Sequence, residues 1–321
     1  MLALASPASL KGVLTPLAAA AFLAEGLRRV DGVAVDEAPV ADGGEGTAAV
    51  LEAALGGEWR TAVVQGPLGA PVDARWLVLP DGTAVVESSQ AVGLPLLTRF
   101  ERDPLRATTH GVGDLLLAAV SQGASSLLVG VGGTATVDGG AGMLERLGGR
   151  LAGVTTRVAC DVTNPLLGPR GAARVFGPQK GAGPDAVVEL ERRLAAMKEL
   201  AAYAELPGAG AGGGLGAALA SLGAELVPGG ELVLDLIGFD GRAESADLVV
   251  TGEGAVDATT FEGKAAGTVI ARCRRLGVPC EVFGGLVAPG IEAHALSGRR
   301  EDAGADLVRL GEELALALVA R

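Results

Sequence analysis

Short apolar runs alternate with longer segments of mixed polarity at both ends of the chain, with glycine-rich loops between them. At the N-terminal end, the predicted elements are a strand over residues 2–5, a helix beginning at Thr15-Pro16, a strand over 33–40, a loop over 41–47 and a helix through Leu55. At the C-terminal end, they are a strand over 247–251, a loop over 252–257, a helix over about 264–276 and a strand over 279–284. This alternation of strand and helix is typical of a parallel α/β sheet.

The pattern changes in the middle of the chain, where strand-like runs follow one another without a helix between them. Runs over residues 62–65, 72–79 and 84–87, with the turn Pro80-Asp81-Gly82, predict antiparallel strands. Further helices and strands continue to about Gly241.

We therefore predict an α/β protein with two domains. Residues 1–58 and 243–321, from the two chain ends, form one domain with a parallel sheet, and residues 59–242 form an inserted domain of mixed α/β structure. Ligands bind beyond the carboxyl ends of strands in open α/β sheets, so a cleft between the two domains is the expected ligand site.

Composition and charge narrow the class of protein. The 321 residues are 49% hydrophobic, which suffices for two cored domains and excludes a disordered chain. A net charge of −12 argues against nucleic acid and acidic membrane surfaces as partners. The uncharged stretches 115–137 and 206–224 are broken by polar residues or glycines, so neither predicts a membrane span, and we find no signal peptide. The three cysteines fit neither a disulfide framework nor a zinc site, so a reducing cytoplasm is expected.

Several familiar catalytic motifs are missing from the sequence. Gly208-x-Gly210-x-x-Gly213 matches a dinucleotide fingerprint, but 51 glycines in 321 residues make about one such match expected by chance, and no strand precedes it. There is no Walker A motif and no Gly-x-Ser-x-Gly elbow. A dinucleotide-binding enzyme, a P-loop NTPase and a serine hydrolase are therefore disfavoured.

Carboxylates recur inside glycine-rich loops at the ends of predicted strands. The three loops are Asp42-Gly-Gly-Glu45-Gly-Thr47, Gly132-Gly133-Thr-Ala-Thr-Val-Asp138-Gly-Gly-Ala-Gly142 and Thr251-Gly-Glu253-Gly-Ala-Val-Asp257. Backbone N–H groups in such loops bind phosphate oxygens, carboxylates hold Mg²⁺ and lysines neutralise developing charge, as phosphoryl transfer requires. The alternative for any single loop is an ordinary turn with an acidic helix cap, but three such loops favour phosphoryl transfer.

Further polar residues follow other predicted strands. Asp161 and Asn164 end a short strand, where they either bind a metal or a substrate hydroxyl or form an Asx turn before Pro165. Lys180 lies in a Gly-Pro turn. Lys11 follows the first strand and is either a phosphate-binding lysine or a surface lysine.

In this order, the motifs resemble those of the bacterial type I glycerate kinases, and the chain looks like a shortened, divergent member of that family. The matching segments are residues 41–47, 103–109, 132–143, 159–168, 175–182, 207–216 and 251–257 through Lys264. Because they recur across most of the chain, they are far more specific than any one glycine motif.

The resemblance implies that the γ-phosphate of ATP is transferred to a hydroxyl of glycerate with the help of Mg²⁺, between a flavodoxin-like domain and a second α/β domain. ATP and glycerate are then the expected partners, while the acceptor hydroxyl and homodimer formation are left open. The candidate catalytic residues are Asp42, Asp138, Asp161, Asp257 and Lys11, with Asp138 and Asp161 as the Mg²⁺ ligands. The candidate residues for binding glycerate or nucleotide are Glu45, Gly132, Gly133, Asn164, Lys180, Gly212, Gly213, Glu253 and Lys264.

Four features depart from the family pattern. Ala8 stands where the family has Asp, and Val137 replaces an Asn. Residues 148–158 form a shorter segment than usual, and Ser88-Ser89-Gln90 replaces a run of the Met-Ala-Ala type. These departures leave two alternatives beside a glycerate kinase. One is a catalytically impaired protein that binds a metabolite or nucleotide, and the other is a kinase for another small hydroxy acid.

Overall fold

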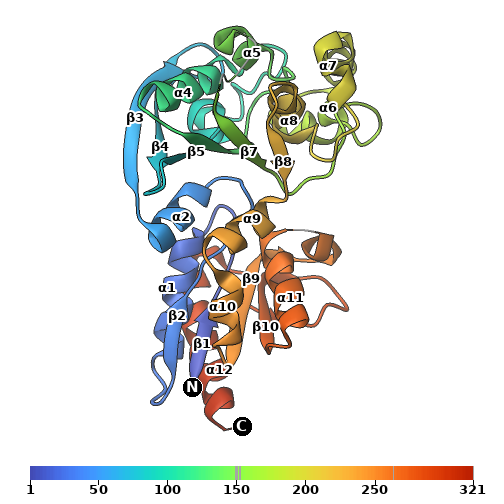
Figure 1. Ribbon diagram of the computed structural model, residues 1–321. Helices are drawn as coiled ribbons and strands as arrows, with labels where there is room; N and C mark the ends of the chain where they lie inside the picture. The colour runs from blue at the N-terminus through green and yellow to red at the C-terminus, as the bar shows by residue number, and fades with distance from the viewer. Residues whose placement is uncertain (149–150, 152, 263, 321) are drawn as a thin grey trace. The chain divides into compact units, whose positions relative to one another are not determined.

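The computed structural model describes residues 1–148, 151, 153–262 and 264–320, and the chain divides into two compact units (Figure 1). Unit 1 comprises Met1–Asp42, Ala49–Ala54 and Gly230–Arg321, and unit 2 comprises Gly43–Ala48 and Leu55–Gly229. Each unit contains one β-sheet, and both chain ends contribute strands to the sheet of unit 1. Within the described residues, no helix is long and apolar enough to cross a membrane.

Unit 1 contains a five-stranded parallel sheet. Its order is β11 (His294–Ala295), β10 (Cys280–Val287), β9 (Leu248–Val256), β1 (Leu2–Ala5) and β2 (Ala34–Glu37). Counted by appearance along the chain, this is the 2-1-3-4-5 order of flavodoxin-like sheets, which confirms the predicted fold class. Ligands bind such sheets beyond the carboxyl ends of the strands where the order reverses, which here is between β1 and β9.

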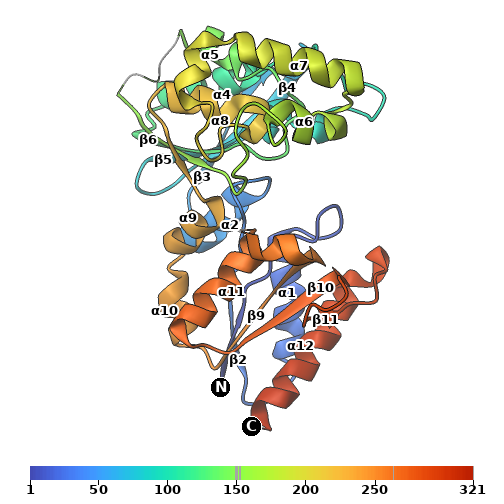
Figure 2. The same cartoon turned by 90° about the vertical axis from the view of Figure 1, so that its right-hand side faces the viewer.

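Helices cover both faces of this sheet (Figure 2). The helices of unit 1 are α1 (Pro16–Leu27), α9 (Gly229–Leu236), α10 (Phe239–Glu244), α11 (Ala265–Leu276) and α12 (Ala303–Val319). α1 and α12 pack together over an apolar core, while α11 contacts β9 and β10 from the opposite face. The predicted start of α1 is confirmed, because the Thr15 Oγ1 accepts a hydrogen bond from the Ala18 N–H at 3.2 Å and Pro16 begins the helix.

Unit 2 contains a six-stranded mixed sheet. Its order is β3 (Glu58–Gln65), β4 (Pro71–Val78), β5 (Thr83–Glu87), β6 (Ser126–Gly130), β7 (Thr155–Ala159) and β8 (Glu225–Val227). β3, β4 and β5 pair antiparallel, which confirms the prediction, whereas β5 to β8 pair parallel. The carboxyl ends of β5, β6 and β7 therefore lie next to one another at one edge of the sheet.

Short helices connect and cover the strands of unit 2. They are α3 (Ser89–Val92), α4 (His110–Ser121), α5 (Ala141–Leu147), α6 (Ala172–Phe176), α7 (Pro184–Ala196) and α8 (Ala211–Ser221), and α2 (Thr47–Leu55) contributes residues to both units. 3₁₀ helices span Leu94–Leu96, Pro178–Lys180 and Lys198–Tyr203 in unit 2, and Ala258–Glu262 and Arg300–Asp302 in unit 1. The core of unit 2 includes the fully buried Trp76 on β4.

The prediction of a loop over residues 252–257 is wrong. β9 continues through Val256, and its second half pairs in parallel with β10. The glycines in this segment allow close approach of neighbouring backbone instead of making a turn. A Cβ on Gly252 would lie 2.3 Å from the Phe283 carbonyl oxygen, and one on Gly254 would lie 3.3 Å from the backbone nitrogen of Lys11. Glu253 is therefore held on a strand.

Candidate functional site

The glycine-rich loop after β2 packs across the carboxyl ends of the parallel strands of unit 2. A Cβ on Gly43 would lie 2.5 Å from the carbonyl oxygen of Ala159, the last residue of β7. Likewise, a Cβ on Gly130, at the end of β6, would lie 2.3 Å from the Gly43 carbonyl oxygen, and one on Gly132 would lie 2.8 Å from the Gly44 Cα. Only glycine permits this approach, so the structure brings together three of the segments singled out in the sequence.

Glu87, the last residue of β5, holds this loop and was missed by the sequence analysis. Its Oε1 accepts hydrogen bonds from the Gly46 N–H at 3.1 Å and the Ala48 N–H at 2.8 Å, at the start of α2. The side chain is buried, and this burial raises the pKa of the Glu87 carboxyl. Glu87 thereby fixes the backbone that directly follows Glu45, on either side of Thr47. A carboxylate ending an otherwise apolar strand is the sequence signal that could have revealed it.

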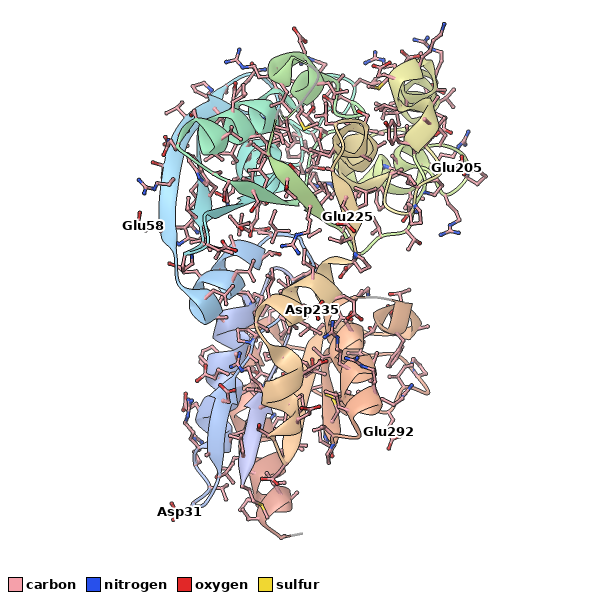
Figure 3. The ribbon with its side chains drawn as sticks, in the orientation of Figure 1. Asp31, Glu58, Glu205, Glu225, Asp235 and Glu292 are labelled. Atoms are coloured by element: carbon pink, nitrogen blue, oxygen red, sulfur yellow. The ribbon has the colours of Figure 1, made fainter. Side chains whose placement is uncertain are left out.

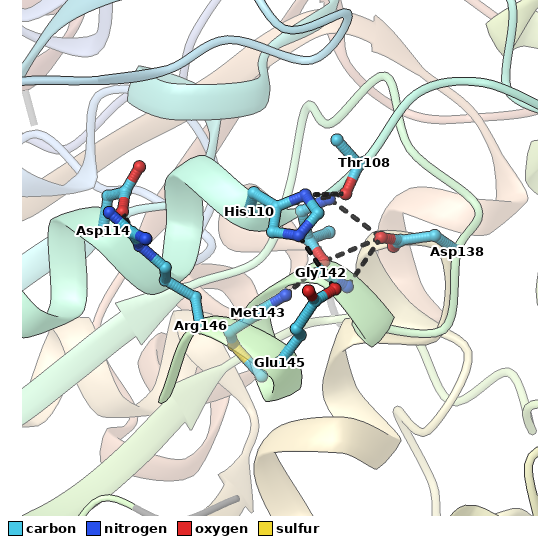
Figure 4. Close-up of polar contacts among 9 residues, drawn as sticks. Thr108, His110, Asp114, Asp138, Gly142, Met143, Glu145 and Arg146 are labelled. Carbon is cyan, nitrogen blue, oxygen red and sulfur yellow. Dashed lines mark hydrogen bonds and ion pairs between the residues drawn. The ribbon is translucent and has the colours of Figure 1, made fainter. Parts of the chain in front are cut away.

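Asp138 joins the N-terminal ends of α4 and α5 (Figure 4). Its Oδ2 accepts hydrogen bonds from the Thr109 N–H at 2.8 Å, the Thr109 hydroxyl at 2.9 Å and the Gly142 N–H at 3.3 Å. Its Oδ1 accepts one from the Gly140 N–H at 3.1 Å. The Thr109 hydroxyl also accepts a hydrogen bond from the Met143 N–H at 3.0 Å. Both carboxylate oxygens are thus engaged in fixing the loop, and a catalytic or metal-binding role for Asp138 stays a prediction.

Replacing Asp138 with alanine is expected to lower the free energy of unfolding of unit 2 by about 2–4 kcal/mol, because it leaves buried N–H donors without an acceptor. Urea titration followed by tryptophan fluorescence measures this, since both tryptophans, Trp59 and Trp76, lie in unit 2. Asp81→Ala is the matched control, because Asp81 is exposed and accepts one hydrogen bond, from Thr83 in a turn. Equal urea midpoints for the two variants would contradict the anchoring role.

Lys180 lies behind the loop that Asp138 ends. Its side chain is only 3% exposed, and its Nζ donates hydrogen bonds to the Thr134 hydroxyl at 3.0 Å and the Thr136 carbonyl at 2.7 Å. Burial lowers the pKa of Lys180 to about 7, although the negative charge of Asp138 acts in the opposite direction. The Lys180 amine is therefore buried against the glycine loop, where burial opposes its positive charge and Asp138 favours it.

Two other predicted segments pack around the same loop. Asn164, after β7, donates from its side chain to the Arg170 carbonyl at 2.7 Å, and its own carbonyl accepts from the Gly210 N–H at 2.9 Å. Gly212 and Gly213 have φ of +62° and +76°, and a Cβ on Gly213 would lie 2.0 Å from the Thr136 carbonyl oxygen. These glycines are required by packing within the protein, and nucleotide binding by them stays a prediction.

The remaining predicted residues lie in unit 1, on a separate set of strand ends. A pocket of about 300 Å³ there is lined by Lys11, Glu253 and Lys264, among others. The Lys264 Nζ lies 3.8 Å from a carboxylate oxygen of Glu253 and 3.9 Å from one of Asp257. Hydrogen bonds from Thr259, together with the positive charge of Lys264, lower the pKa of Asp257.

The structure thus divides the candidate residues between the units. Lys11, Glu253, Asp257 and Lys264 belong to unit 1, and Asp42 ends the first segment of that unit. The candidates in unit 2 are Glu45, Gly132, Gly133, Asp138, Asp161, Asn164, Lys180, Gly212 and Gly213. Among the described residues, no group of three or more His, Cys, Asp or Glu side chains could hold a metal ion.

The positions that depart from the family pattern are also visible. Ala8 is 6% exposed, with its N–H donating to the Gly252 carbonyl at 2.9 Å, and Val137 is 1% exposed. Ala8 is therefore buried in the segment after β1, and Val137 is buried within the glycine loop of residues 132–142. Residues 149, 150 and 152 of the short segment 148–158 lie outside the described residues.

Comparisons with known proteins, by sequence and by structure, all match glycerate kinases. A sequence model described as "Glycerate kinase family" matches residues 3–156 and 149–306. The chain is 39% identical to a glycerate kinase of Halalkalibacterium halodurans, over 90% of this chain and 86% of that protein. It is 45% identical to the glycerate 2-kinase of Escherichia coli K12 over 61% of each chain, so this alignment spans less than two thirds of that relative. A crystal structure of a provisionally named glycerate kinase 2 from Salmonella typhimurium LT2 matches with a TM-score of 0.85 and 33% identity, over 100% of this chain and 98% of the other.

Proposed function

This chain belongs to the glycerate kinase family, and from that premise we propose that it transfers the γ-phosphoryl group of ATP directly to a hydroxyl of glycerate. The observation that carries the proposal is the buried ammonium of Lys180 behind a glycine loop, beside the packed carboxyl ends of β5, β6 and β7. Positively charged groups and backbone N–H groups of this kind stabilise the charge on a phosphoryl group in transfer. The name of the E. coli relative supports the 2-hydroxyl as acceptor.

The chain's own residues would act chiefly by positioning and by charge. Lys180 would neutralise negative charge on the transferred phosphoryl group, and the glycine loops after β2 and β6 would fix its oxygens through backbone N–H groups. Asp42, Asp161 and Asp257 remain the candidates for accepting the proton of the attacking hydroxyl. No covalent enzyme intermediate is needed.

Mg²⁺ fits the residues present without a dedicated cage. Mg²⁺ in kinases is held by one or two carboxylates together with substrate phosphates, so the lack of a larger acidic cluster in the described part of the chain is compatible with it. Asp138 fits poorly as a ligand, because both of its carboxylate oxygens already accept hydrogen bonds from the protein. When bound, Mg²⁺ would offset the negative charge of the phosphate oxygens.

A coupled assay of ADP release, with and without glycerate, tests the proposal. We expect glycerate-dependent release, and NMR of the product is expected to place the phosphate on the 2-hydroxyl. If ADP release depends instead on another hydroxy acid, glycerate is not the acceptor, but phosphoryl transfer from ATP to a hydroxyl is still supported. Thermal stabilisation by ATP or glycerate without turnover would overturn the proposal and favour an impaired binding protein, as Ala8 and Val137 would then explain.

A further inference from the structure

The pocket in unit 1 lies at the point of the sheet where the strand order reverses. Its walls come from the segment after β1, the second half of β9, the end of β10 and the segment between β11 and α12. At about 300 Å³ it is within the range of small-molecule sites. Lys11 and Lys264 are candidate site residues from the sequence alone, whereas the segment between β11 and α12 carries no such prediction.

Four cationic side chains line the pocket, namely Lys11, Lys264, Arg299 and Arg300, against the carboxylates of Glu253 and Asp306. The chain as a whole has a net charge of −12. Acidic residues such as Glu58 and Glu292 are exposed, and Figure 3 shows them extending from the surface of the chain. A cationic pocket in such a protein attracts an anion.

The two carboxylates of the pocket already have partners within the protein. Asp306 is 3% exposed, accepts a hydrogen bond from the Ser297 N–H at 2.9 Å and pairs with Arg309 at 2.6 Å. Glu253 accepts a hydrogen bond from the Thr260 hydroxyl at 2.6 Å. Two of the cationic side chains also have acidic neighbours, since Lys264 lies 3.8 Å from Glu253 and Arg299 pairs with Asp302 at 2.5 Å. These ion pairs are at the protein surface and can exchange for a bound anion.

Apart from Ser9, the rest of the lining is apolar side chains and glycine. Leu10, Val13, Leu286 and Leu296 contribute to the pocket, and Leu286 is 65% exposed to solvent on β10. Glycerate offers nothing to such a surface, because each of its three carbons carries oxygen. A nucleotide has both parts, a flat base for the leucines and a polyphosphate for the lysines and arginines.

We propose that this pocket of unit 1 is the nucleotide site, with the base against Leu286 and Leu296 and the phosphates at Lys11, Lys264, Arg299 and Arg300. This deepens the proposed function and rests on it for the identity of the nucleotide as ATP. The loops of unit 2 then remain the candidates for binding glycerate.

Calorimetric titration of the full chain with Mg²⁺ and the non-hydrolysable analogue AMP-PNP tests the assignment. Leu286→Glu and the double variant Arg299→Glu, Arg300→Glu are expected to weaken AMP-PNP binding at least tenfold and to leave the Kd of glycerate within about twofold. These side chains are exposed, so the variants should fold, and thermal melting checks this. Arg274→Glu, an exposed charge reversal on α11, is the matched control.

The outcomes separate this inference from the proposed function. Weakened glycerate binding with unchanged AMP-PNP binding would overturn the assignment and make the pocket the glycerate site. Unchanged binding of both would also overturn it, even if the chain phosphorylates glycerate. Weakened AMP-PNP binding in a chain that does not phosphorylate glycerate would support the pocket while refuting the proposed function.

Discussion

Replacing Lys180 with methionine is expected to lower kcat/KM for glycerate phosphorylation by about 10²- to 10³-fold. Methionine has a similar length and stays buried, but it cannot place a positive charge behind the loop that begins at Gly132. The variant loses electrostatic stabilisation of the transferred phosphoryl group, and such stabilisation is strong in a site from which water is excluded. The coupled ADP-release assay measures it.

The same variant makes a prediction about pH and stability. Burial lowers the pKa of Lys180 from 10.5 to about 7, so between these values the native state binds fewer protons than the unfolded state. The free energy of unfolding of the wild type should therefore rise with pH from about 7 to 10.5, relative to Lys180→Met, by a few kcal/mol at about 1.4 kcal/mol per pKa unit.

Lys198→Met is the matched control for both measurements, because Lys198 is exposed in the same unit. It should retain wild-type kcat/KM and the wild-type pH dependence of unfolding. If Lys180→Met keeps full activity, the buried ammonium is structural only, and the observation on which the proposed function rests is lost.

Local signals in the sequence predicted the elements that local interactions determine. Thr15-Pro16 marks the start of α1 because the Thr15 hydroxyl caps the N–H three residues on. Pro80-Asp81-Gly82 marks the turn between β4 and β5 because Gly82 takes a φ of +84°, which side chains rarely adopt.

Long-range pairing decides the parts that were missed. The glycines of residues 252–257 resemble a turn in the sequence, but hydrogen bonding of β9 to β10, about 30 residues away, extends the strand. Glu87 belongs to an apolar strand run, and its partners Gly46 and Ala48 lie about 40 residues earlier. The carboxylate at the end of an apolar strand could have marked the position, but its partners are decided by the packing of a loop distant in the sequence.

Replacing Glu87 with alanine is expected to lower kcat/KM about 10²-fold and to destabilise unit 2, because the N–H groups of Gly46 and Ala48 lose their common acceptor and the loop carrying Glu45 is released. Glu87→Gln keeps a carbonyl oxygen at the same position, so it should retain activity within a few-fold. The measurements are kcat and KM separately, with urea unfolding followed by tryptophan fluorescence. Glu225→Ala, at an exposed position on β8, is the control and should resemble the wild type in both.

The ionisation of Glu87 makes the stability of the fold depend on pH, and this dependence tests the role of the carboxyl group. Burial raises the pKa of Glu87 in the folded state, so the Glu87 carboxyl stays protonated to higher pH in the native chain than in the unfolded chain. Its ionisation therefore destabilises the fold as pH rises from the ordinary pKa of the carboxyl through the raised one. Glu87→Gln lacks this loss, so its stability relative to the wild type should increase over that range. If Glu87→Gln instead loses activity as severely as Glu87→Ala while remaining folded, Glu87 acts through its charge on the reacting groups and not by positioning the loop.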